Sequence, residues 1–332
     1  MTARRISLLA HLGEHCATLP PASADNVARV LGRLAEASVA IQHELAHAAL
    51  LDRLGETGAR NRTGDTVKKL DEWGHEIVVA ALEASGACAV LISEEAEEPI
   101  EFKAPQGMIV CCDPVDGSSS LDVGGAVGTI FGVRPPRGVG PAARAALGSG
   151  RDQIAAGYVL YGPSTLFVYT IGRGVHAFTL DRNKGEFLLT QPEIRVPKRG
   201  RTYGINEGNV HTWSPGQRAF VEHLKTPDKA SGRPYSLRYS GAMVADVHRV
   251  LHDGGIFMYP ADMSDPAKPK PKLRLLYEVA PIAFVAEQAG GRASTGKEPA
   301  LDIVATDYHQ RAAILVGSPD DVALAEQFYS RG

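Results

Sequence analysis

Two aspartates follow a short apolar run in the first half of the chain, where their carboxylates could bind a cation. The run Met108–Val110 is short and β-branched, as in a buried strand, and Asp113 and Asp116 come directly after it. The intervening proline fixes its own backbone, so the carbonyl group of Val115 can turn towards the same point. Carboxylate and carbonyl oxygens are ligands that hard cations such as Mg²⁺ prefer. This strand end therefore indicates a metal site.

The residues after these aspartates are small and suit a bound phosphate. Gly117 permits a tight turn, and residues 118–120 are serines with free backbone N–H groups. An Asp-Gly pair alone would indicate an ordinary turn after a core strand. The whole run 113–120 is more specific than that pair, and it predicts a turn that holds a metal and a phosphate together.

A second pair of acids lies at the end of another expected strand. Glu94 and Glu95 follow the apolar run Ala89–Ile92. Two carboxylates about 4 Å apart repel by about 4 kcal/mol at an effective dielectric of ~20. A divalent cation removes this repulsion, so the two acidic strand ends are interpreted as two edges of one metal cage.

Two further acids occupy positions that need an explanation. Asp65 precedes a helix expected over residues 66–85, where it could cap the helix or bind a metal. Glu278 falls on an otherwise apolar helix expected over residues 272–289. An acid in such a setting should be paired or bound to a metal.

A different chemistry is offered by a helix expected over residues 23–51. His43, Glu44 and His47 form a literal H-E-x-x-H, whose histidines would share one helix face and could bind zinc. The usual third-ligand extension after His47 is missing, although Glu72 could supply a glutamate ligand. The alternatives are a zinc peptidase and a surface helix with chance spacing.

Composition excludes several classes of function. The chain has 332 residues and a net charge of −3, which gives no reason to expect a nucleic acid or an anionic membrane as partner. No apolar run approaches the ~20 residues that span a bilayer, and the start has no signal-like apolar stretch. We expect a cytoplasmic enzyme. Its cysteines, expected to be buried reduced thiols, are Cys16, Cys88, Cys111 and Cys112.

The pattern along the chain predicts a mixed α/β protein in two halves. Four short strands between residues 154 and 189 have the spacing of an antiparallel meander. Proline and basic residues cluster near 192–199, and we place the boundary there. The N-terminal half, 1–195, would carry most metal ligands, and the C-terminal half is 196–332. Further strands are expected over 128–133, 202–205, 255–261 and 312–316, and further helices from 215, within 237–249 and over 320–329.

Taken together, these motifs resemble class I fructose-1,6-bisphosphatase, within the magnesium-dependent, lithium-sensitive sugar phosphatases. The resemblance runs from about residue 64 to the C-terminus and includes Asn206-Glu207-Gly208 and the run 272–278. It implies a layered α/β/α/β/α sandwich, a homotetramer, sugar-phosphate binding by the C-terminal half, and hydrolysis of the 1-phosphate of fructose 1,6-bisphosphate. Sedoheptulose-1,7-bisphosphatase and inositol-type phosphatases, which share the metal cage, are the alternatives.

The resemblance also implies a role for each site residue. Two or more Mg²⁺ ions, with Mn²⁺ as a substitute, would be bound by the carbonyl of Val115 and the carboxylates of Asp65, Glu94, Asp113, Asp116 and Glu278. Glu95 and Asp71 would activate the attacking water. The 1-phosphate would be held by the backbone of Gly117, Ser118 and Ser119 and by Arg274. The sugar and its 6-phosphate would be held by Asn206, Tyr239, Tyr259 and Lys272, with Arg238 contributed by a neighbouring subunit.

Two positions depart from the family pattern. Ser120 stands where the family usually has asparagine in the phosphate turn. Asn209 stands where a phosphate-binding tyrosine often follows Asn-Glu-Gly, which removes one expected contact to the 6-phosphate.

Overall fold

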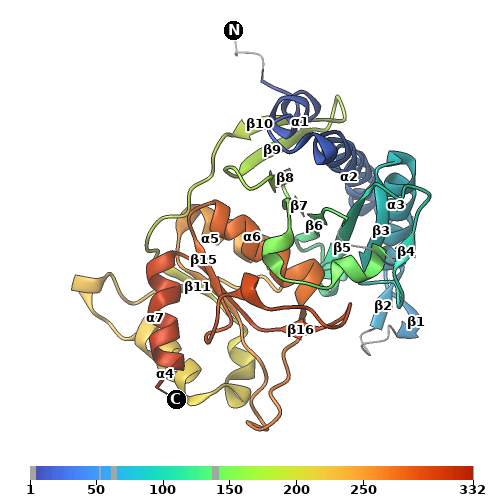
Figure 1. Cartoon of the computed structure of the whole chain (residues 1–332). Coiled ribbons are helices and arrows are strands. Elements are labelled where there is room, and N and C mark those ends of the chain that lie inside the picture. The colour runs from blue at the N-terminus through green and yellow to red at the C-terminus, as the bar shows by residue number, and fades with distance from the viewer. Residues whose placement is uncertain (1–4, 52–53, 61–65, 137–141, 332) are drawn as a thin grey trace.

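Five layers, alternately helical and β-sheet, make up the protein (Figure 1). The computed structural model describes residues 5–51, 54–60, 66–136 and 142–331. Three helices cover the outer face of a large sheet, two helices lie between that sheet and a smaller one, and two more cover the far side. The predicted α/β/α/β/α sandwich is confirmed.

The first β layer is an eight-stranded sheet. Its order is β10-β9-β8-β7-β6-β5-β3-β4, and its neighbours are antiparallel except β3 and β5, which run parallel. β3 and β5 are buried at every position, because helices cover both faces of the sheet here. The antiparallel meander predicted between residues 154 and 189 is confirmed as β7 to β10. The strands are β3 (Cys88–Ser93), β4 (Ile100–Glu101), β5 (Met108–Asp116), β6 (Val127–Arg134), β7 (Ala155–Tyr161), β8 (Thr165–Thr170), β9 (His176–Asp181) and β10 (Glu186–Gln191).

The outer helical layer consists of α1 (Leu8–Cys16), α2 (Pro21–His47) and α3 (Lys69–Ser85). A two-stranded ribbon of β1 (Glu56–Arg60) and β2 (Thr66–Lys68) connects α2 to α3. α3 begins with a capping interaction, in which the backbone N–H of Lys68 donates to Asp71 Oδ2 at 3.0 Å. It ends at Gly86, which adopts the left-handed conformation typical of helix C-termini.

The central layer contains α5 (Met243–Asp253) and α6 (Ala280–Gln288), which contact both sheets. Residues 280–286 of α6 are all buried, as expected for a helix covered on both sides. A π-helical turn, Leu275–Val279, leads into α6 and carries Glu278.

The second sheet has five strands in the order β12-β11-β13-β17-β15, and α4 (Pro215–Lys225) and α7 (Pro319–Tyr329) cover its outer face. A separate ribbon pairs β14 (Leu273–Arg274) with β16 (Arg311–Ala312). The strands of the sheet are β11 (Thr202–Gly204), β12 (Ser236–Leu237), β13 (Ile256–Tyr259), β15 (Arg292–Ser294) and β17 (Ile314–Gly317).

Three hydrophobic cores fill the spaces between the layers. The largest lies between the two sheets and surrounds α5 and α6. All four cysteines are buried and free, which confirms the expected reduced thiols. Within the described ranges, no helix is both long and apolar enough to cross a membrane.

Several expected element boundaries were wrong. The helix predicted over residues 66–85 begins at Lys69, because residues 66–68 pair with β1. The helix predicted over 272–289 begins as strand β14 and a π-helical turn, and α6 starts at Ala280. Helix α1 and strand β15 were missed.

Candidate active site

A cavity of about 440 Å³ opens where the C-terminal end of β5 meets the second sheet. β5, the 3₁₀ helix Ser118–Val123 and the start of α3 line one side. β13, β14 and the π-helical turn also line the cavity. Three cationic side chains of the described chain reach its wall, Lys68, Lys272 and Arg274. They face seven carboxyl groups, those of Asp71, Glu94, Glu95, Asp113, Asp116, Asp246 and Glu278.

Three of these acids form a compact group, which we call the acid trio: Asp113, Asp116 and Glu278. Their carboxylate oxygens lie within 4.8 Å of one another, and all three residues are buried. Asp113 and Asp116 come from the end of β5, and Glu278 comes from the π-helical turn. The acids predicted from two distant parts of the sequence are therefore adjacent.

Backbone amides orient each member of the acid trio. The N–H of Val115 donates to Asp113 Oδ1 at 3.0 Å, and the N–H of Val244 at the start of α5 donates to Asp116 Oδ2 at 2.9 Å. The N–H of Arg274 donates to Glu278 Oε2 at 2.6 Å. These bonds hold the carboxylates in place without neutralising them.

The carboxylates of the acid trio repel one another when no cation is bound. Burial, followed by repulsion from Glu94, raises the pKa of Asp113 and of Glu278 well above the ordinary range. Burial raises the pKa of Asp116 to about 7, with Glu94 adding to the effect, although the amide bond from Val244 opposes it. Carboxyl groups packed this closely are stable together as anions when a cation shares them.

Glu94 and Arg274 form an ion pair at the edge of the acid trio. Arg274 Nη1 lies 2.9 Å from Glu94 Oε1, and both side chains are largely buried. The backbone N–H of Glu94 donates to the carbonyl of Cys112 on β5, which ties the ends of β3 and β5 together. The guanidinium group therefore stands beside the carboxylates that line the cavity.

Glu95 and Asp71 lie on the same wall as potential proton acceptors. Burial and the neighbouring charge of Glu94 raise the pKa of Glu95 to about 8. Burial raises the pKa of Asp71 to about 6. Asp71 Oδ2 accepts the N–H of Lys68, whereas Asp71 Oδ1 is buried and has no hydrogen-bond partner. An orphaned carboxylate oxygen beside a cavity is available to a water or a cation.

The turn that follows β5, where a phosphate was predicted to bind, depends on a glycine. Gly117 has φ 78°, in the left-handed region, and a Cβ at this position would lie 2.6 Å from the Cβ of Ala242. The 3₁₀ helix begins at Ser118, and the first N–H groups of such a helix have no partner within it. Ser118 and Ser119, which carry the first of these N–H groups, line the cavity.

The far side of the cavity carries polar groups from the second half of the chain. Tyr239, Tyr259 and Lys272 line it. Tyr259 and Lys272 also line a second cavity of about 260 Å³, which contains Asn206 and Asn209. Arg238 is outside both cavities, exposed, and its Nη1 donates to the carbonyl of Leu237.

Most predicted site residues thus converge on these two adjoining cavities, and Asp65 lies outside the described residues. Sequence reasoning missed two others. Lys68 lines the cavity and donates to Asp122. Asp246 also lines it and accepts the backbone N–H of Ser240.

The H-E-x-x-H pair does not become a metal site in the described part of the chain. His43 and His47 are exposed near the end of α2, with ring centroids 4.5 Å apart. His47 Nδ1 lies 2.7 Å from the carbonyl oxygen of His43. Within the described ranges, no third histidine, cysteine or acid joins them at ligand distance.

An acid-lined cavity beside a turn of glycine and serine residues is typical of enzymes that transfer phosphoryl groups with metal ions. Comparison with known proteins specifies the family. Residues 14–192 match the model of the fructose-1-6-bisphosphatase N-terminal domain, and residues 196–330 match that of the C-terminal domain. The chain belongs to the fructose-1,6-bisphosphatase family.

Individual members of this family are similar to the chain over most or nearly all of its length. The class 1 fructose-1,6-bisphosphatase of Oleidesulfovibrio alaskensis is 45% identical over 99% of each chain. That of Thermosynechococcus vestitus is 45% identical over 92% of this chain and 88% of its own. The crystal structure of Leishmania major fructose-1,6-bisphosphatase in holo form superposes with a TM-score of 0.90, at 35% identity, over 99% of this chain and 100% of its own.

Proposed function

We propose that this enzyme hydrolyses the 1-phosphate of fructose 1,6-bisphosphate, using Mg²⁺ or Mn²⁺, and releases fructose 6-phosphate. The observation that carries the proposal is the acid trio facing the phosphate turn in one cavity. Family membership supports the same substrate, because the curated relatives are named for it. The sedoheptulose-bisphosphatase and inositol-phosphatase alternatives receive no such support from these relatives.

The donor set fits hard divalent cations. The acid trio and Glu94 supply buried carboxylate oxygens, and Asp71 adds an oxygen with no protein partner. Mg²⁺ and Mn²⁺ prefer oxygen ligands, whereas zinc and copper favour nitrogen and sulfur. We assign the metal-ligand role to Glu94, Asp113, Asp116, Glu278 and the carbonyl of Val115, and retain Asp65 as a predicted ligand. Bound cations would supply Lewis-acid polarisation of the phosphoryl oxygens.

The chain's own groups would position the reactants. The amides of Gly117, Ser118 and Ser119 would hold the 1-phosphate, and the Arg274 guanidinium would neutralise its charge. Asp71 and Glu95 would accept the proton of the attacking water, Asp71 through the oxygen that has no partner. Phosphoryl transfer depends mainly on such positioning and charge stabilisation.

The second cavity would anchor the far end of the sugar. Asn206 Oδ1 accepts the N–H of Gly208 at 3.0 Å, so its amide nitrogen is left to donate. Tyr259 and Lys272 line both cavities, and Tyr239 lies on the first. A 6-phosphate held here would place the 1-phosphate at the acids. We further propose a homotetramer in which Arg238, exposed on a single chain, reaches the 6-phosphate of a neighbouring subunit.

A phosphate-release assay tests this proposal. The substrates are fructose 1,6-bisphosphate, sedoheptulose 1,7-bisphosphate and inositol 1-phosphate, each in Mg²⁺ and in EDTA, with the product identified by ³¹P NMR. We expect the highest kcat/KM for fructose 1,6-bisphosphate, only in Mg²⁺, with fructose 6-phosphate as product. Lys272→Met should raise KM, and Lys268→Met, an exposed lysine outside both cavities, should not. A higher kcat/KM for the inositol phosphate, or full activity in EDTA, would overturn the proposal.

A further inference from the structure

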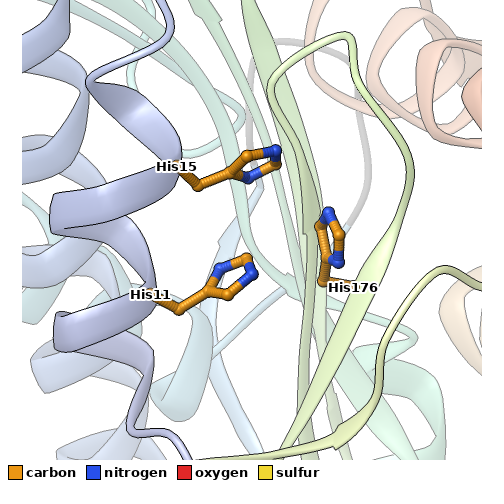
Figure 2. Close-up of side chains that lie close together, drawn as sticks. All are labelled: His11, His15 and His176. Carbon is orange, nitrogen blue, oxygen red and sulfur yellow. The ribbon is translucent and has the colours of Figure 1, made fainter.

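A second cluster of potential metal ligands lies away from the active site. His11 and His15 project from one face of α1, and His176 projects from β9 towards them (Figure 2). One ring nitrogen from each lies within 4.8 Å of the others, and all three side chains are half-buried. None of these residues lines either active-site cavity.

The spacing of the three rings matches that of a tetrahedral metal centre. The ring centroids are 5.0 Å apart for His11 and His15, 4.8 Å for His11 and His176, and 4.7 Å for His15 and His176. A Zn–N bond is about 2.0–2.1 Å and a ring nitrogen lies about 1 Å from its ring centre, so tetrahedral ligands have centroids about 5 Å apart. The triangle is nearly equilateral and already close to this size.

The cluster makes few hydrogen bonds, and its partners are the Tyr169 hydroxyl and the carbonyl of Arg173, which contacts both His15 and His176. The Tyr169 hydroxyl lies 2.6 Å from His11 Nδ1 and 3.3 Å from His15 Nδ1, so it can accept an N–H from both rings. Metal-bound histidines are usually held in this way through the nitrogen that does not bind the metal. His176 Nδ1 is buried without a hydrogen-bond partner, and its Nε2 has a long 3.4 Å contact with the Arg173 carbonyl. Either nitrogen of this ring can therefore bind a cation.

The protonation state is compatible with this role. Burial and the neighbouring imidazoles lower the pKa of His11 to about 4, and burial also lowers the pKa of His15 and of His176. Neutral imidazole is the form that binds metals.

We propose that His11, His15 and His176 bind one transition-metal cation, with Zn²⁺ as the best fit and water in the fourth position. A set of three imidazoles selects Zn²⁺, Co²⁺, Ni²⁺ or Cu²⁺ over Mg²⁺. The bound ion joins α1 to β9. Without it, the start of α1 is attached to β10 by the N–H of Leu189, which donates to the Ile6 carbonyl, and by a bridge between Ser7 and Leu188.

Cobalt serves as the spectroscopic probe, since four-coordinate Co²⁺ with nitrogen ligands absorbs strongly in visible light. The EDTA-treated enzyme is held in millimolar Mg²⁺ to fill the acidic site and is then titrated with Co²⁺ or Zn²⁺. We expect one equivalent to produce the cobalt spectrum, and Zn²⁺ at 100 times its Kd to raise Tm by about 3–5 °C. His176→Gln and His15→Gln should each abolish both effects.

The double variant His43→Gln/His47→Gln is the matched control, because it removes an exposed pair with the same i, i+4 spacing that has no third ligand among the described residues. It should keep the spectrum and the Tm shift. Folding of each variant is checked by its Tm in Mg²⁺ alone. Because His15→Gln and His176→Gln change different elements, one variant still tests the proposal if the other fails to fold. Equal cobalt spectra and zinc content in the wild type, His15→Gln and His176→Gln would overturn the proposal, as would the absence of any four-coordinate cobalt spectrum in the wild type.

Discussion

Removing one charge from the acid trio should stabilise the metal-free protein, and Asp116→Asn tests this. The three carboxylates lie within 4.8 Å of one another, and at that distance each ionised pair repels by about 3 kcal/mol at an effective dielectric of about 20. Asp116 takes part in two such pairs. Protonation and small side-chain movements relieve part of the repulsion. We therefore expect the free energy of unfolding to rise by about 1–3 kcal/mol, or Tm by about 2–4 °C for a chain of this length.

The assay compares thermal unfolding at pH 8 in EDTA and in saturating Mg²⁺. In EDTA the variant should be the more stable protein, because the repulsion is reduced. In Mg²⁺ the order should reverse, because cation binding stabilises the wild type and a neutral amide is a weaker ligand. The phosphatase rate of the variant should fall by about 100-fold or more, since the cations contribute several kcal/mol to the transition state.

Asp321→Asn is the matched control, because Asp321 is buried but lies far from the acid trio in the fold. It accepts the N–H of Gly200 at 2.9 Å and the hydroxyl of Tyr235 at 2.8 Å, and it lies 3.7 Å from Arg199. This variant should lose the same stability in both buffers. If Asp116→Asn also lowers Tm equally in EDTA and in Mg²⁺, the carboxylate is a structural acceptor for Val244 and the repulsion argument is refuted.

Three further predictions concern the turn, the second phosphate and the H-E-x-x-H pair. Gly117→Ala should lower the free energy of unfolding by about 2 kcal/mol more than Gly124→Ala. Both glycines have positive φ, but a Cβ at Gly117 would also clash with Ala242. Equal losses of unfolding free energy in urea would contradict this. Arg238→Ala should raise KM for the bisphosphate about tenfold with little change in kcat, and a fall in kcat alone in steady-state assays would exclude a binding role. His43→Ala/His47→Ala should keep the phosphatase rate, and metal analysis that finds zinc lost on this substitution would revive the peptidase alternative.

The acids of the site were predictable because the signal is local. A buried strand that ends in carboxylates, as at Glu94 and Asp113, is unusual enough to indicate a metal without knowledge of the fold. The lone acid in an apolar helix, Glu278, carried the same information. Contacts between residues far apart in the chain could not be predicted from these local patterns. The N–H that orients Asp116, for example, belongs to Val244, 128 residues away.

The expectations that failed did so where local pattern is ambiguous. The run Lys272-Leu273-Arg274-Leu275 is compatible with a helix or a strand. Its two central residues form a strand because they pair with β16. Lys68 reads as a helix-surface charge, but it ends β2 and reaches Asp122, a contact that depends on the tertiary fold. Helix α1 has only nine residues, so its apolar positions Leu8, Leu12 and Cys16 give a weak local signal, and its stability comes from packing on α2 and β10.

The central helical layer has a consequence for synthesis on the ribosome. The large sheet is complete once β10 ends at Gln191, but α6, which covers its inner face, begins at Ala280, 89 residues later. At about 5–20 residues per second the inner face of the sheet waits about 4–18 s for this cover. Helix α5, which packs on β6 and β7, is synthesised within this interval, but side chains that pack against α6, such as Val168 on β8, have no helix to cover them until it is made. The nascent chain therefore exposes part of a hydrophobic sheet face to chaperones and to other chains, although the finished protein buries most of it.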